Sequence, residues 1–175
     1  MPSSKLPAVK AAPAPVSPES AAFRQAMAQV TAAVHVITTF GAKGRAGLTA
    51  SAVTSLSDSP AMMLACIHAD SRTLEAIQTN GVFCVNTLSG ADQEVGETFA
   101  GRKGLAGEER FAVGNWSELV TGSPVLATSL VAFDCKLIES RLHATHHVII
   151  GEVVGIGGTG VGAGLIYRSR TFGSF

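Results

Sequence analysis

Charge is scarce in this chain. Only 15% of its 175 residues are charged, and the 13 basic and 13 acidic side chains cancel to a net charge of zero with histidine neutral. A chain without surplus positive charge offers no strong field for nucleic acid or for an acidic membrane surface. So few charges also allow part of the outer surface to be buried against another subunit, and we expect a homodimer.

Cysteine is also scarce, and long apolar runs are missing. Cys66, Cys84 and Cys135 each lie in an apolar run, with neither a CxxC motif nor a nearby histidine at ligand spacing, so we expect three buried free thiols in a reducing compartment.

No apolar stretch approaches the roughly 18 residues of a membrane span. Residues 1–17 are rich in Ala, Pro and Ser and lack the apolar core of a secretory signal. We expect a disordered tail over 1–17, one domain over 18–175 and a cytoplasmic location.

Several catalytic motifs are absent as well. The chain has no nucleophile elbow, no paired carboxylates and no HExxH motif. Residues 155–160 fit the GxGxxG pattern, but only fifteen residues follow and none is acidic, so we interpret them as a glycine-rich hairpin loop rather than a dinucleotide fingerprint. His146 and His147 would face opposite sides of a strand, which argues against a metal site.

Extended segments dominate what is present. The sequence predicts a helix from Pro18, with Ser17 as its N-cap, which would cover one mouth of a sheet or barrel. Two further short helices are predicted over 71–80 and 91–99, and Trp116 is the expected anchor of a long loop. Strands are predicted over 34–40, 48–57, 61–68, 82–88, 130–140, 147–156 and 165–168. Without regular alternation of strand and helix, this pattern favours a mainly antiparallel β-barrel with short flanking helices.

Two segments rich in hydroxyl groups are candidates for binding. Along 47–60, small residues would let a flat ring approach the backbone, and strand alternation would place Thr49, Ser51 and Ser55 on one face. An ordinary serine- and threonine-rich strand with one face in solvent is the alternative. Asp70-Ser71-Arg72-Thr73 stands at a helix start, where free N–H groups, hydroxyls and a guanidinium can hold an anion, although a simple N-cap would look the same.

An ordered set of motifs covers roughly residues 20–172. The set includes FRQAMAQVTAAVHVITT, GLTASAVTSLSDSPAMMLACI, SRTLEAIQTNGVFCVNTL, FAGRKGLAGEERF, LVAFDCKLIE, THHVIIGEVVGI and LIYRSRTF. In this order, the motifs resemble the short-chain flavin reductase family. The resemblance implies the FMN-binding split β-barrel fold. It also implies a homodimer that reduces FAD or FMN with NADH or NADPH and supplies reduced flavin to a partner monooxygenase.

The resemblance also implies roles for particular residues. His146 corresponds to a histidine beside the nicotinamide, although Ala144-Thr145 replaces the Gly-Asp that precedes it in the family. The residues implied to bind the flavin or its phosphate are Thr49, Ala50, Ser51, Ser55, Ser71, Arg72 and Thr73, with Phe99, Ala100 and Gly101 beside the ring and Arg168 and Arg170 near the chain end. Two alternatives stay open. Some relatives that reduce a cobalt corrin carry a run like Thr145-His146-His147, and a flavin- or haem-binding module without turnover would share the fold.

Overall fold

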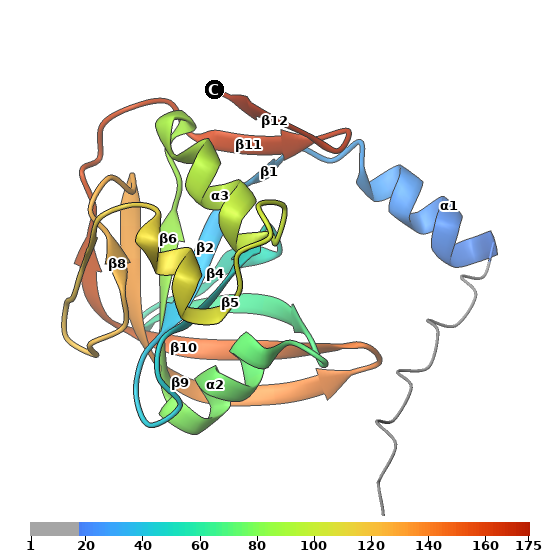
Figure 1. The fold of residues 1–175 in the computed structure, drawn as a ribbon. Helices are drawn as coiled ribbons and strands as arrows, with labels where there is room; N and C mark the ends of the chain where they lie inside the picture. The colour runs from blue at the N-terminus through green and yellow to red at the C-terminus, as the bar shows by residue number, and fades with distance from the viewer. Residues whose placement is uncertain (1–17) are drawn as a thin grey trace, which may run out of the picture.

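The computed structural model describes residues 18–175 (Figure 1), so the tail expected over 1–17 lies outside the described residues. The helices are α1 (Pro18–Met27), α2 (Arg72–Asn80) and α3 (Gln93–Phe99), with 3₁₀ turns at Gly90–Asp92 and Gly107–Ala112. The strands are β1 (Ala32–Ala33), β2 (His35–Thr39), β3 (Ala46–Ala50), β4 (Val53–Asp58), β5 (Ala61–His68), β6 (Val82–Thr87), β7 (Trp116–Ser117), β8 (Val125–Leu126), β9 (Val131–His143), β10 (His146–Gly157), β11 (Leu165–Arg168) and β12 (Thr171–Ser174). Within this part of the chain, no helix is long and apolar enough to cross a membrane.

Seven strands form one antiparallel sheet that curls on itself. Their order is β3-β2-β6-β9-β10-β5-β4, so β3 and β4 occupy opposite ends of the sheet although only Ser51 and Ala52 separate them in the chain. A flat sheet of seven strands would place its edges about 29 Å apart, which two residues cannot span. The sheet must therefore bend until its edges meet, and the hydrogen bond from the Cys66 amide to the Ala52 carbonyl, at 2.9 Å, helps to fix the crossing. The expected split β-barrel is confirmed.

The crossing corrects the prediction of a single strand over 48–57. The extended run is broken at Ser51 and Ala52, with β3 pairing to β2 and β4 pairing to β5 on the other side of the barrel. Simple alternation therefore does not place Thr49, Ser51 and Ser55 on one face. The prediction failed here because the residues before and after Ser51 and Ala52 both have strand-like composition. Only the closure of the barrel marks the boundary between the two strands.

Two apolar clusters fill the interior. The barrel core contains the fully buried Ile37, Phe83, Val85 and Ile149. Gly151 on β10 allows Phe83 to lie against the backbone, because a Cβ at that position would lie 2.6 Å from Cε1 of the ring. The second cluster packs under α3, where Phe99 and Trp116 meet with their ring centroids 5.4 Å apart. Trp116 is thus the anchor that the sequence predicted.

Helix α2 follows the predicted signals closely. The Ser71 hydroxyl accepts a hydrogen bond from the Leu74 amide, and Gly81 ends the helix in the left-handed conformation at φ 72°. Such a cap favours glycine because a Cβ there is strained. Leu74 and Ile77 point inward and join the barrel core.

The two ends of the described chain depart from prediction. Helix α1 does not cover a mouth of the barrel but projects away from it (Figure 1), with Phe23 exposed to 66%. The sequence also missed β12, which pairs with β11 beside β1 in a small separate sheet. The glycine-rich stretch starts inside β10 and leads to β11 of that second sheet with no helix between. It is therefore neither a dinucleotide fingerprint nor the expected hairpin loop.

Candidate active site

Three clefts meet at the crossing between β3 and β4. The first, of about 340 Å³, is here called the histidine cleft because His68 and His146 line it. The second, of about 190 Å³, is the aromatic cleft, beside Tyr167 and Phe172. The third, of about 540 Å³, is the arginine cleft, beside Arg24, Arg168 and Arg170. Ser51 lines all three, so the segment that closes the barrel is also the point at which the clefts join.

The crossing segment, defined here as residues 49–52, is held in place by its neighbours. The Thr49 hydroxyl donates to the Gly96 carbonyl on α3 at 2.7 Å, and the Gly47 carbonyl accepts from the Thr73 hydroxyl on α2 at 3.1 Å. These two bonds tie β3 to both helices. Thr49, Ala50 and Ser51 each line the histidine and aromatic clefts, and their small side chains leave room for a planar group beside the backbone.

The start of α2 forms one wall of the histidine cleft. Ser71 lines the cleft, while Arg72 is exposed on the first turn of the helix. Thr73 is buried with its hydroxyl directed to Gly47, so its side chain fixes the helix against β3. Free N–H groups at a helix N-terminus, together with a guanidinium, suit a phosphate. Ser71 and Arg72 are thus better placed for an anion than Thr73.

His146 and His147 have different surroundings, as strand alternation predicted. His146 lines the histidine cleft and meets His68 edge to face, with the ring centroids 5.1 Å apart. His147 instead approaches Ser140, with 3.0 Å between its Nδ1 and the hydroxyl. The prediction from sequence missed His68, which ends β5 and accepts a hydrogen bond from the Asp70 amide at Nδ1. Its pairing opposite His146 across β5 and β10 could be found only from the strand register.

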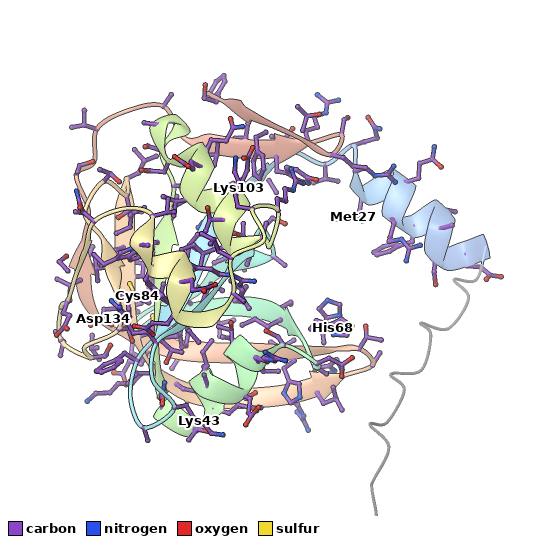
Figure 2. All side chains as sticks on the ribbon, in the orientation of Figure 1. Met27, Lys43, His68, Cys84, Lys103 and Asp134 are labelled. Carbon is purple, nitrogen blue, oxygen red and sulfur yellow. The ribbon has the colours of Figure 1, made fainter. Side chains whose placement is uncertain are left out.

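Figure 2 shows His68 rising from the end of β5 and Met27 at the end of α1, on the side of the molecule from which α1 projects. His68 lines the histidine cleft and Met27 lines the arginine cleft.

The aromatic cleft includes residues that the prediction did not name. The Arg102 guanidinium lies over the Tyr167 and Phe172 rings, at 5.6 and 4.9 Å from their centroids, and donates to the Tyr167 hydroxyl at 2.9 Å. Ala100 lines this cleft, as expected, beside the crossing segment. Phe99 instead is buried in the second apolar cluster, and Gly101 forms the turn after α3 at φ 78° without lining a cleft.

The remaining predicted residues divide between the arginine cleft and the outer surface. Arg168 and Arg170 line the arginine cleft together with Arg24, which the prediction missed. Ser55 lies exposed on β4 and lines none of the three clefts. A separate cavity of about 570 Å³, between Phe40 and Trp116, is lined by none of the residues predicted to bind the flavin or the nicotinamide.

The cysteines offer no reactive thiolate. Burial raises the pKa of the Cys135 thiol to about 12 and raises the pKa of Cys84 further, so both stay protonated at neutral pH. Both are buried free thiols as expected, whereas Cys66 is only half-buried and lines the histidine cleft. Chemistry at this site therefore does not run through a buried cysteine nucleophile.

Comparison with known proteins identifies the family. The model of the flavin reductase like domain matches residues 27–175. The chain belongs to this family. It is 45% identical over 150 residues to the FMN reductase (NADH) RutF of Ancylobacter novellus, covering 86% of this chain and 82% of the relative. The expectation of an oxidoreductase of the flavin reductase family is thereby confirmed.

Solved structures agree with this assignment. A Haemophilus somnus protein assigned to the flavin reductases matches with a TM-score of 0.84 and 40% identity, over 89% of this chain and 98% of that one. Component B of nitrilotriacetate monooxygenase from Mycobacterium thermoresistibile matches with a TM-score of 0.81 and 27% identity, over 90% of this chain and 87% of that one.

Proposed function

We propose that this flavin reductase uses NADH to reduce FMN bound along Thr49–Ser51 and releases the reduced flavin to a partner monooxygenase. The observation that carries the proposal is the meeting of the histidine and aromatic clefts at these three small residues. The name of the Ancylobacter novellus relative supports FMN and NADH as substrates, and the Mycobacterium thermoresistibile protein, a monooxygenase component, supports the partner.

The residues present fit a flavin. When bound, the flavin supplies a ring that accepts a hydride from the nicotinamide, a step that needs little acid or base from the protein. Ser51 offers a hydroxyl toward ring carbonyls and the ribityl chain, and Ala50 leaves space for the ring beside the backbone. The Thr49 hydroxyl donates to the Gly96 carbonyl, so toward the flavin it can accept a hydrogen bond from a ring N–H or a ribityl hydroxyl. Ser71 and Arg72 hold the phosphate at the start of α2.

His146 orients the nicotinamide in this scheme. It lines the histidine cleft together with the crossing segment, and its Nδ1 is 2.9 Å from the Thr145 hydroxyl. The edge-to-face contact with His68 restricts the rotation of both rings. Holding two reacting rings at close range is the main contribution that a protein can make to hydride transfer.

We further propose that the enzyme is a homodimer. Helix α1 has ten residues, and a helix of this length is marginal in water unless its apolar face is packed. Within the described chain, Phe23 remains 66% exposed and Met27 49% exposed. A second copy packed against α1 would bury both. Light scattering should report a dimer that Phe23→Ser weakens, whereas a wild-type monomer with full activity would refute the assignment.

Oxidation of NADH in the presence of excess FMN tests the function. The absorbance of the reduced nicotinamide should fall at a rate that depends on added free flavin, with FAD and NADPH compared as alternative substrates. Tight flavin binding without turnover would instead indicate a binding module. Turnover only when a cobalt corrin is added would identify a different electron acceptor.

A further inference from the structure

We propose that the cavity between Phe40 and Trp116 binds a small alkylated ammonium ion. This cavity is here called the tryptophan cavity. Its volume of about 570 Å³ lies in the range of sites for small organic molecules, and it shares no lining residue with the three clefts at the crossing. The inference therefore goes beyond the proposed function, which uses the clefts at the crossing.

The tryptophan cavity is built from segments that lie far apart in the chain. Phe40 directly follows β2, Trp116 begins β7, and Pro124 directly precedes β8. Figure 1 shows β8 on the side of the barrel away from α1, whereas α1 contributes to the arginine cleft. A ligand in the tryptophan cavity therefore leaves the crossing segment free for the flavin.

Two aromatic side chains line the tryptophan cavity. Phe40 is 45% exposed, and among residues 18–175 no other ring stacks on it. Trp116 is half-buried, and its Nε1–H donates to the Val113 carbonyl at 2.9 Å, so the indole offers a ligand aromatic surface but no free donor. The faces of aromatic rings carry partial negative charge and attract cations, tryptophan most strongly.

The charged side chains of the lining leave one negative charge unpaired. Arg45 forms an ion pair with Glu108, to which its Nε donates at 2.7 Å. The Arg45 guanidinium also lies 4.9 Å from the centroid of the Phe111 ring, so this cation is already engaged with groups other than Phe40 and Trp116. The exposed Glu118 also lines the cavity and forms no ion pair with any residue in 18–175. The lining as a whole therefore favours a positive ligand.

An alkylated ammonium ion suits this combination of rings and carboxylate. Its charge is spread over a shell of CH groups, so it can lie against aromatic rings and be attracted by a nearby carboxylate without losing strong hydrogen bonds to water. A bare metal ion would need several ligands, and no cluster of three histidine, cysteine or acidic side chains suited to a metal occurs in the described part of the chain. An anion would be repelled by Glu118 and would have to compete with Glu108 for Arg45.

Calorimetry with choline tests the binding of such an ion. The neutral probe of the same shape is 3,3-dimethyl-1-butanol, in which a carbon atom replaces the charged nitrogen, and both titrations are made at one ionic strength. Choline should bind about tenfold more tightly than the alcohol, because only the cation gains from the ring faces and from Glu118. Lack of choline binding, or equal affinity for the two probes, would overturn the inference.

Tryptophan fluorescence shows where the cation binds. Trp116 is the only tryptophan of the chain, so a change in emission with the same midpoint as the calorimetric titration places choline beside this indole. Choline binding without any change in emission would overturn the assignment to this cavity. The calorimetric affinity for choline should also be the same with and without excess FMN, whereas competition with FMN would move the cation to the clefts at the crossing and overturn the inference.

Substitutions in the lining separate the charge from the rings. Glu118→Gln should weaken choline binding about tenfold and leave the affinity for the alcohol unchanged, and Phe40→Leu, which keeps an apolar side chain but removes the ring face, should weaken choline binding by a similar factor. Glu139→Gln is the matched control, because Glu139 is exposed on β9 and does not line the cavity. It should bind choline with the wild-type affinity. Wild-type affinity for choline in Glu118→Gln and in Phe40→Leu would overturn the inference, whether or not the protein reduces flavin.

Discussion

His35 should make the stability of this enzyme depend on pH below neutrality. The side chain lies on β2, opposite Ala50 of the crossing segment, and is only 8% exposed. Burial lowers its pKa from 6.5 to about 4, because the charged ring would lose its hydration. Its Nδ1 is 3.0 Å from the Thr87 hydroxyl, so the ring has a neutral hydrogen-bonding partner.

The sign and size of the effect follow from proton linkage. Between pH 6.5 and about 4 the unfolded state binds a proton at His35 that the folded state does not, so stability falls as the pH falls. The full shift is equivalent to about 3 kcal/mol, of which about 2 kcal/mol is lost between pH 7 and pH 5. Above about pH 8 this histidine has almost no effect on the dependence of stability on pH.

Urea unfolding at a series of pH values between 5 and 7, at one protein concentration, measures the loss. His35→Gln should be less stable at pH 7, because the packing of the ring is lost, but its stability should vary less with pH by about 2 kcal/mol over this range. His143→Gln, at the exposed end of β9, is the matched control and should keep the wild-type slope. A wild-type slope in His35→Gln would refute the reasoning.

Three further predictions concern the site and the core. Arg72→Ala should raise the Michaelis constant for FMN by about one to two decades, with little change in turnover at saturating flavin, and an unchanged constant would remove Arg72 from the phosphate site. His146→Ala should raise the Michaelis constant for NADH and slow anaerobic flavin reduction in stopped flow, whereas His147→Ala should do much less; the reverse order would move the nicotinamide to the other face of β10. Gly151→Ala should destabilise the fold by about 3 kcal/mol in urea unfolding, because its Cβ would meet the Phe83 ring, and a change below about 1 kcal/mol would show that the ring can move aside.

The sequence predicted those elements that carry local signals. Ser71 as N-cap and Gly81 as C-cap bound α2 closely to prediction, and alternation separated His146 from His147 correctly. Neither result needed knowledge of the tertiary structure, because capping and strand alternation depend on residues close together in the chain.

Features that depend on distant segments were not predictable in the same way. The break at Ser51 and Ala52 has no local turn signal, because it arises where β3 leaves β2 and β4 joins β5. Arg102 meets Tyr167 across 65 positions of sequence, and His68 meets His146 only through the pairing of β5 with β10. Periodicity assigns a residue to a face of its own strand, but it cannot say which other strand will lie beside it.

Barrel closure and the location of the site have the same physical origin. A residue inside the sheet has a neighbouring strand on each side. These strands form hydrogen bonds with its backbone N–H and C=O groups and limit the space beside its side chain. At the crossing, the chain has left β2 and has not yet joined β5, so Ser51 lies in a gap of the sheet where three clefts can open. Small residues keep that gap open, and the flanking helices and the β11–β12 hairpin contribute the polar groups around it. The split in the barrel thus leaves room for planar ligands without weakening the core, since the fully buried residues that fill the barrel lie on the strands on either side and on α2.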